Sequence, residues 1–226
     1  MTKTWGKEIW EKKSQNQSGL GVSGGVISII RGKKAYFENM KRIQKEFSLF
    51  LNKHKNIKNA LEVGPGPYAL NAKFLLNKGY ELDLVDCSPN TLRLVKEKIL
   101  NKEIVLFEQD MTELNISKKY DLILCLGTFI HCPPHLSMVT MNNFNKQLKK
   151  NGYLIIDFPI KHRMTLKRAL WAGFYSVGHR IKTKITGKNF YTTCGEYTHE
   201  ELKDIFKRTN FKVIQKKRLW ILQKIN

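Results

Sequence analysis

The chain has 226 residues, 42% of them apolar, which is enough for one full hydrophobic core but too little for two comparable domains. Its 40 lysines and arginines against 19 aspartates and glutamates give a formal net charge of +21. That balance suits a nucleic acid, an anionic membrane surface or an acidic small substrate as a partner, although the predominance of lysine makes compositional drift an equally good explanation.

The cysteines and the first residues indicate the cellular setting. Cys87, Cys125, Cys132 and Cys194 form no C-x-x-C pair and show no metal-ligand spacing, so we expect reduced thiols and no metal site. The opening MTKTWGKEIW lacks the apolar core of a signal peptide, and no run approaches the roughly 20 apolar residues of a membrane span. These features predict a soluble, cytoplasmic protein.

The first 57 residues are expected to form a helical extension. Residues 4–13 fit a short helix with an aromatic face, whereas Ser18–Ile30 contains four glycines and is expected to be a non-helical lid or connector. Lys34–His54 is the clearest amphipathic helix of this part, and core packing is the expected role of its apolar stripe. That stripe comprises Phe37, Met40, Ile43, Phe47 and either Phe50 or Leu51.

From residue 58 onward, short apolar runs alternate with helical patterns, which is typical of βαβ units around a parallel sheet. We predict strands near 58–63, 81–86, 103–107, 120–126 and 152–158, and helices near 68–78, 89–100 and 136–149. An Asn-Gly turn should separate the last of these helices from the fifth strand. Thr198 and Glu201 fit a capping box for a further helix, and two final strands are expected from Phe211 onward.

The stretch ALEVGPGPYAL, residues 60–70, reads as strand, glycine turn and helix, the framework of a nucleotide-type cofactor site. Glu62 stands two residues before Gly64. A carboxylate there would repel a pyrophosphate but attract a cationic ligand end, such as the ammonium group of S-adenosylmethionine. Asp86 follows about 20 residues later, at the end of the second strand, where an acidic side chain can accept both ribose hydroxyls.

Two further strand ends carry polar side chains. Asp110 follows the third strand at the edge where open sheets bind ligands, so it could hydrogen-bond an adenine amino group; alternatively, it caps the turn that follows it. The near-continuous apolar run Tyr120–Pro134 fits a strand buried on both faces. It exits into Gly127, Thr128 and His131 at the same edge of the sheet.

In this order, the motifs ALEVGPGPY, LDLVDCSPNTL, FEQDMTEL, YDLILCLGTFIHCPP and LKKNGYLIIDF resemble those of the class I S-adenosylmethionine-dependent methyltransferases. The resemblance covers Asn59 to about Pro159. It implies a Rossmann-like, three-layer α/β domain over residues 58–226, with a mostly parallel seven-stranded sheet and an antiparallel last strand. Residues 1–57 would form an amino-terminal helical cap, and an insertion near 160–193 a second cap. The implied cofactor is S-adenosyl-L-methionine, with S-adenosyl-L-homocysteine as its product.

The resemblance also implies a cofactor site at the strand ends. The methionine part would lie against Glu62 and the glycines, the ribose against Asp86, and the adenine against Asp110 and Met111. Relatives commonly have a further glycine or small residue where Pro67 and Tyr68 stand, so Tyr68 either closes over the methionine end or marks a pocket of different shape. The predicted cofactor-binding residues are Glu62, Gly64, Gly66, Tyr68, Asp86, Cys87, Asp110, Met111, Leu126 and Gly127.

Methyl transfer from a sulfonium is an in-line displacement with a neutral leaving group, so the protein mainly positions the acceptor and excludes water. His131 is the first candidate for a general base because it follows the fourth strand and imidazole titrates near neutrality; the alternative is a structural role. His162, just beyond the fifth strand, is a second candidate. We interpret Cys132 as a packing cysteine rather than a nucleophile.

Residues 159–193 are basic and carry aromatic residues at rough helical spacing. They could form a lid in which Trp171, Tyr175 and Tyr191 face the substrate, a surface for RNA or anionic lipid, or a packed helix with a solvated cationic face. The function predicted is O- or N-methylation of a small molecule, and the basic charge would suit an anionic one. The alternatives are an RNA methyltransferase that uses the basic surface, and a catalytically silent cofactor-binding protein.

Overall fold

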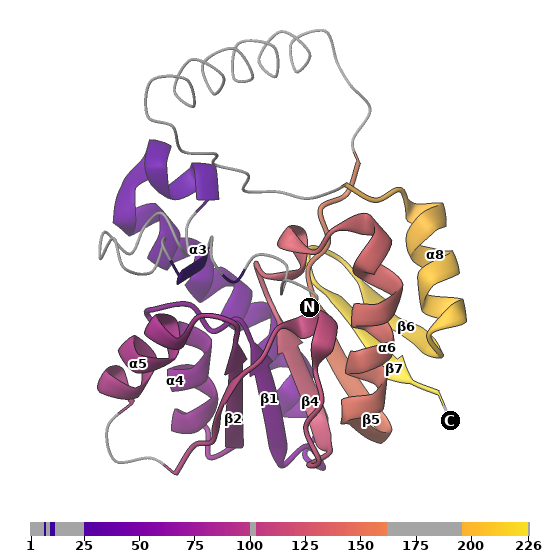
Figure 1. Cartoon of the computed structure of the whole chain (residues 1–226), viewed down its shortest axis with the longest axis horizontal. Coiled ribbons are helices and arrows are strands. Elements are labelled where there is room, and N and C mark those ends of the chain that lie inside the picture. The colour runs from indigo at the N-terminus through magenta and orange to yellow at the C-terminus, as the bar shows by residue number, and fades with distance from the viewer. Residues whose placement is uncertain (1–6, 8–9, 12–24, 100–102, 162–195, 226) are drawn as a thin grey trace, which may run out of the picture.

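The computed structural model describes residues 7, 10–11, 25–99, 103–161 and 196–225, and these build one seven-stranded sheet with helices on both faces (Figure 1). The strand order is β3-β2-β1-β4-β5-β7-β6, and among these seven strands β7 alone runs opposite to the other six. The predicted Rossmann-like sheet with an antiparallel last strand is therefore confirmed. The strands are β1 (Asn59–Val63), β2 (Glu81–Asp86), β3 (Leu106–Glu108), β4 (Tyr120–Cys125), β5 (Leu148–Ile156), β6 (Phe211–Lys216) and β7 (Trp220–Lys224).

Two groups of helices complete the three layers. One face of the sheet is covered by α3 (Gly25–Lys53), α4 (Leu70–Asn77) and α5 (Pro89–Lys98), and the other by α6 (Ser137–Gln147) and α8 (His199–Arg208) (Figure 1). Short 3-10 turns lie at Met111–Glu113, Phe129–His131 and Pro134–Leu136. None of the helices in this described part of the chain is long and apolar enough to cross a membrane.

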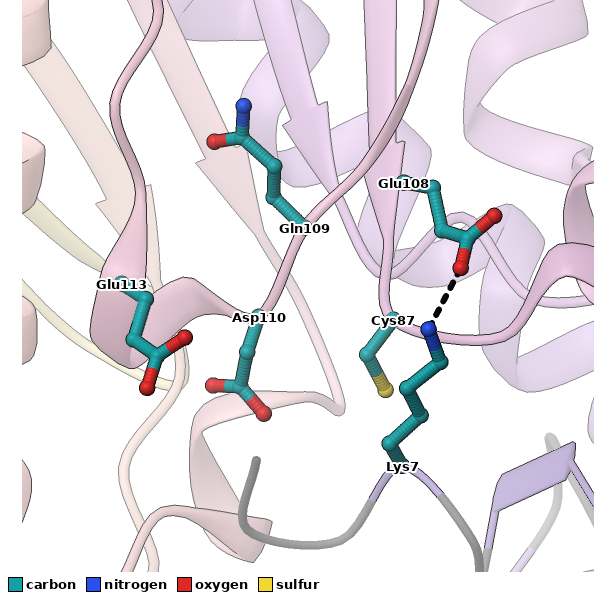
Figure 2. Close-up of a pocket in the computed structure, with 6 residues that line it drawn as sticks. All are labelled: Lys7, Cys87, Glu108, Gln109, Asp110 and Glu113. Atoms are coloured by element: carbon teal, nitrogen blue, oxygen red, sulfur yellow. Dashed lines mark hydrogen bonds and ion pairs between the residues drawn. The ribbon is translucent and has the colours of Figure 1, made fainter. Parts of the chain in front are cut away.

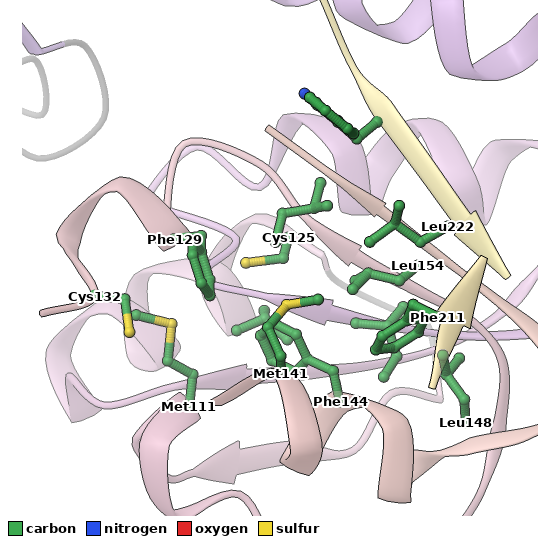
Figure 3. Close-up of a cluster of buried hydrophobic side chains, with 14 of the residues drawn as sticks. Met111, Cys125, Phe129, Cys132, Met141, Phe144, Leu148, Leu154, Phe211 and Leu222 are labelled. Atoms are coloured by element: carbon green, nitrogen blue, oxygen red, sulfur yellow. The ribbon is translucent and has the colours of Figure 1, made fainter. Parts of the chain in front are cut away.

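The central strand β4 shows why the chain folds this way. Side chains alternate across a strand, so Leu122 and Leu124 join the core beneath α3 and α4, whereas Ile123 and Cys125 join the core beneath α6 and α8. All four are fully buried, as the near-continuous apolar run predicts. Figure 3 shows the second of these cores, where side chains from the sheet meet those of α6.

The amphipathic helix expected at Lys34–His54 is confirmed as part of α3, and its residues Phe47 and Leu51 are fully buried. The expectation that Ser18–Ile30 is non-helical throughout was wrong, because α3 already begins at Gly25. A glycine costs a helix only about 1 kcal/mol. In a 29-residue helix, the packing of the second half on the core offsets that cost.

The start of β5 also differs from the prediction. The helix before it ends at Gln147 and the strand begins at Leu148, so the Asn-Gly pair lies inside the strand instead of before it. Asn151 has a φ of 61°, and the pairing with β4 shifts register between Tyr120 and Leu122, as at a β-bulge. The Asn-Gly pair thus forms part of a bulge within the strand, instead of the separate turn that its sequence predicts.

Candidate active site

Three of the predicted site carboxylates lie on neighbouring strands. Glu62 is in β1, Asp86 ends β2, and Asp110 follows β3, and these strands are adjacent in the sheet. The strand order reverses between β1 and β4, and open parallel sheets bind ligands at their carboxyl ends beside such a reversal. The structure thus brings the three residues to one edge of the sheet.

Glu62 is almost entirely buried, with 3% of its surface exposed. The Asn71 side chain and the backbone amide of Ala72 hydrogen-bond its carboxyl group, while its Oε2 has no partner among the described residues. Burial raises the pKa of Glu62 to about 8, although both hydrogen bonds act to lower it. A cation placed beside Oε2 would favour the charged form that burial disfavours.

Asp86 is held in place by the turn that starts α5. Its Oδ1 accepts a hydrogen bond from the Ser88 amide at 2.9 Å. Burial, together with the negative charges of Asp110 and Glu11, raises the pKa of Asp86 to about 7. The same burial and the carboxylates of Asp86 and Asp110 also raise the pKa of the Cys87 thiol, which makes Cys87 a neutral lining residue rather than a nucleophile.

Asp110 is buried and caps the 3-10 turn at Met111–Glu113. Its Oδ1 accepts from both the amide and the hydroxyl of Thr112, each at 2.8 Å. The capping interpretation is confirmed, and the contact of Asp110 with adenine stays a prediction. The Met111 side chain packs in the core beside Cys132 and does not line the pocket next to Asp110 (Figure 3).

A small pocket of about 130 Å³ lies at the carboxyl ends of β2 and β3. In Figure 2 the Lys7 ammonium reaches Glu108 beside Cys87, with an Nζ–Oε1 distance of 2.5 Å. Sites for whole drug-sized ligands typically measure about 300–1,000 Å³, so this pocket can hold only part of a ligand such as S-adenosylmethionine. Its lining residues are Lys7, Cys87, Glu108, Gln109, Asp110 and Glu113.

Lys7, Trp10 and Glu11, here called the amino-terminal segment, contact the ends of three strands, β3, β4 and β2 respectively. All three are helical, and their spacing places them on one helix face. Glu11 Oε2 accepts from the Ser88 hydroxyl at 2.7 Å, and the Trp10 ring lies edge-on to His131 with ring centroids 4.5 Å apart. The sequence did not predict these contacts, because each partner lies far away along the chain. The only local sign of them was that the three residues share one helix face.

The glycine turn after β1 is tightly packed. Gly64 has a φ of +69° and donates its N–H to the Val85 carbonyl at 2.8 Å. A Cβ atom on Gly64 would lie 2.2 Å from the Thr128 hydroxyl oxygen, and that oxygen also donates to the Gly64 carbonyl at 3.3 Å. Gly66 likewise has a positive φ of 64°. Backbone conformation and close approach therefore both require glycine at position 64.

Tyr68 packs against α3. Its ring centroid lies 5.5 Å from that of Phe37 and 6.2 Å from that of Tyr36, and the Lys98 ammonium lies 5.8 Å from the ring. Tyr68 thus joins the glycine turn to the helix beneath it and remains half-buried. Its contact with the methionine end of the cofactor stays a prediction.

A methyltransferase domain family matches residues 36–216, which is most of the chain. The chain belongs to the S-adenosylmethionine-dependent methyltransferases. The family confirms the resemblance of the motifs, the enzyme class and the cofactor, S-adenosyl-L-methionine. No curated protein sequence matches the chain.

Solved structures similar to this methyltransferase share its fold at low sequence identity. The magnesium protoporphyrin IX methyltransferase of Synechocystis PCC 6803, with bound S-adenosylhomocysteine, is 15% identical with a TM-score of 0.67, covering 96% of this chain and 97% of that chain. An S-adenosylmethionine-dependent methyltransferase from Clostridium acetobutylicum ATCC 824 is 14% identical with a TM-score of 0.62, covering 88% and 96%. The N-methyltransferase NodS of Bradyrhizobium japonicum WM9 is 14% identical with a TM-score of 0.50, covering 75% and 79%.

The exit of β4 holds the remaining predicted residues of the methyltransferase. Gly127 has a φ of +68° and donates its N–H to Asp157 Oδ1 at 2.8 Å, which joins the ends of β4 and β5. Leu126 is half-buried against the core beneath α3 and α4. His131 is half-buried and faces Trp10. Its role as a base stays a prediction.

Other predicted residues of the methyltransferase have different outcomes. His162, Trp171, Tyr175 and Tyr191 lie outside the described residues, as does most of the basic insertion. Cys132 is buried, and its Sγ lies 3.3 Å from the Thr140 hydroxyl, so its interpretation as a packing residue is confirmed.

Proposed function

We propose that this methyltransferase transfers a methyl group from S-adenosylmethionine to an oxygen or nitrogen atom of a small molecule. The observation that supports the binding mode best is the placement of Glu62, Asp86 and Asp110 on three neighbouring strands. In this proposal Glu62 binds the ammonium group, Asp86 the ribose hydroxyls and Asp110 the adenine. The free Oε2 of Glu62 supports the first assignment, because a buried carboxyl oxygen normally has a partner.

When bound, the cofactor supplies an electrophilic methyl group on a sulfonium. The residues of the chain then orient the two reactants and exclude water. Under this proposal His131 accepts the proton of a hydroxyl or amine acceptor, since it stands at the β4 exit and imidazole titrates near neutrality. His162 is the second candidate base, and the insertion aromatics Trp171, Tyr175 and Tyr191 are the proposed acceptor contacts.

We also propose that the two flanking parts of the chain, residues 1–57 and the insertion near 160–193, cap the pocket of the domain at 58–226. The contacts of Lys7 with Glu108 and of Glu11 with Ser88 support this role for the first part. The cap would restrict access of water to the reacting atoms, as methyl transfer requires.

A small-molecule acceptor is favoured over RNA by the comparison with solved structures. The solved magnesium protoporphyrin IX methyltransferase is named for a small-molecule substrate, and the match covers 96% of this chain and 97% of that chain. The formal charge of +21 supports an anionic acceptor. The same positive charge would also attract RNA, which is therefore the competing acceptor.

Two measurements test the proposal. Calorimetry should show that S-adenosylhomocysteine binds the wild-type chain and binds the Asp86→Ala variant at least tenfold more weakly, because a hydrogen bond to a charged group contributes about 1.5–3 kcal/mol. Absence of binding, or unchanged affinity in the variant, would refute the binding mode. With methyl-labelled cofactor, label should enter a metabolite extract; label in total RNA, with binding that weakens steeply with salt, would instead establish the RNA alternative.

A further inference from the structure

A chain of hydrogen bonds leads from Glu62 to helix α3. The Gln44 amide nitrogen on α3 donates to Asn71 Oδ1 at 3.3 Å and to the Leu70 carbonyl at 3.0 Å, both in the first turn of α4. Asn71 in turn hydrogen-bonds the Glu62 carboxyl. Because the Asn71 oxygen accepts from Gln44, its NH₂ group is the part left to donate to Glu62.

This arrangement leaves one side of Glu62 for a ligand. Glu62 and Asn71 are 3% and 5% exposed, so water does not compete for their hydrogen bonds. Asn71 and the Ala72 amide engage the carboxyl group from α4, whereas Oε2 has no partner in the described part of the chain. An unpaired buried carboxyl oxygen is costly, and such an atom in a native fold calls for a ligand or another explanation.

The helix that carries Gln44 is firmly placed. Phe47 and Leu51, one and two turns further along α3, are fully buried in the same core as Leu75 of α4. By contrast, α4 begins without a side-chain cap, after Ala69 in a left-handed conformation. The Gln44 bond to the Leu70 carbonyl does not cap the first N–H groups of α4, but it joins the first turn of that helix to α3.

We propose that Gln44 and Asn71 are positioning residues for the amino-acid end of the cofactor. They hold the Glu62 carboxyl so that its free Oε2 meets the ammonium group. The inference rests on the proposed function, in which Glu62 binds that group. It assigns part of the cofactor site to α3, a helix that precedes the run of motifs from Asn59 to about Pro159.

The test compares two ligands that differ only at that end. S-adenosylhomocysteine carries the amino-acid group, and 5′-methylthioadenosine lacks it. The Gln44→Met variant keeps the side-chain length but removes the donor. In calorimetry it should bind S-adenosylhomocysteine roughly three- to tenfold more weakly than the wild type and bind methylthioadenosine with unchanged affinity. Asn71→Ala should weaken the binding of S-adenosylhomocysteine at least as much. The double variant should be no worse than Asn71→Ala alone, because Gln44 acts through Asn71.

Asn52→Ala is the matched control, since Asn52 is an exposed amide on the same helix, and it should change neither affinity. Equal losses for both ligands would show that Gln44 only supports the fold, and additive losses in the double variant would show that Gln44 and Asn71 act separately; either overturns the inference. Should Gln44→Met not fold, Gln44→Ala provides the same comparison. Failure of the wild-type chain to bind S-adenosylhomocysteine would refute the proposed function instead.

Discussion

Substitution of Gly64 by alanine should destabilise the protein through two separable effects. A left-handed φ of +69° costs a residue with a Cβ about 1–2 kcal/mol. The new Cβ would also lie 2.2 Å from Thr128 Oγ1 and 2.6 Å from Thr128 Cγ2, and overpacking of this kind costs about 1–3 kcal/mol. We therefore expect Gly64→Ala to lower the free energy of unfolding by about 2–5 kcal/mol, measured by urea denaturation.

Gly79 offers a matched control, because it has a φ of +83° but nothing within 4 Å of where its Cβ would lie. Gly79→Ala should show the backbone cost alone, about 1–2 kcal/mol. Thr128→Ala removes the two nearest clashing atoms, so combining it with Gly64→Ala should recover part of the loss. The reasoning would be refuted if Gly64→Ala cost no more than Gly79→Ala, or if Thr128→Ala gave no recovery.

Three further outcomes are expected. Phe47→Ala should cost about 3–5 kcal/mol of unfolding free energy because Phe47 is fully buried, whereas Leu49→Ala, on a side chain 59% exposed, should cost under about 0.5 kcal/mol in the same urea titration. The pKa of Glu62 rises on folding from 4.5 to about 8, so the folded chain holds an extra proton between those values and stability should fall as pH rises through that window; Glu62→Gln should flatten the fall measured by denaturation at pH 5 and pH 8. His131→Ala should lower kcat about 10²–10⁴-fold while S-adenosylhomocysteine affinity stays unchanged, and a fall in affinity alone would contradict its role as a base.

The features that the sequence predicts well depend on neighbours along the chain. The alternation of apolar runs and helices predicts five strands to within a few residues, and the Thr198–Glu201 capping box is present as expected. The glycine turn and the acidic strand ends are equally local, because a strand and the turn after it are encoded within about ten residues. These signals suffice to predict which edge of the sheet carries the candidate site residues.

The features that the sequence fails to predict depend on contacts between distant segments. Nothing near Lys7 or Gln44 indicates that they reach Glu108 and Asn71, because hydrogen bonding of a surface-like polar residue has no periodicity. The bulge in β5 is hidden for a similar reason. An Asn-Gly pair predicts a turn from local preference, and the pairing of β5 with β4 overrides it.

The distribution of acidic residues is more than compositional drift at the edge of the sheet where we propose that the cofactor binds. The chain has only 19 aspartates and glutamates against 40 lysines and arginines, yet several of these few carboxyl groups meet at one edge of the sheet: Glu11, Asp86, Glu108, Asp110 and Glu113. Burial is the main cause of the raised pKa of Asp86, and the charges of Asp110 and Glu11 add to it. Gathering buried like charges is costly, so a ligand that gains from them is the natural explanation. An anionic acceptor would be repelled there. Under the proposed function it should therefore approach from the β4 exit, where His131 stands.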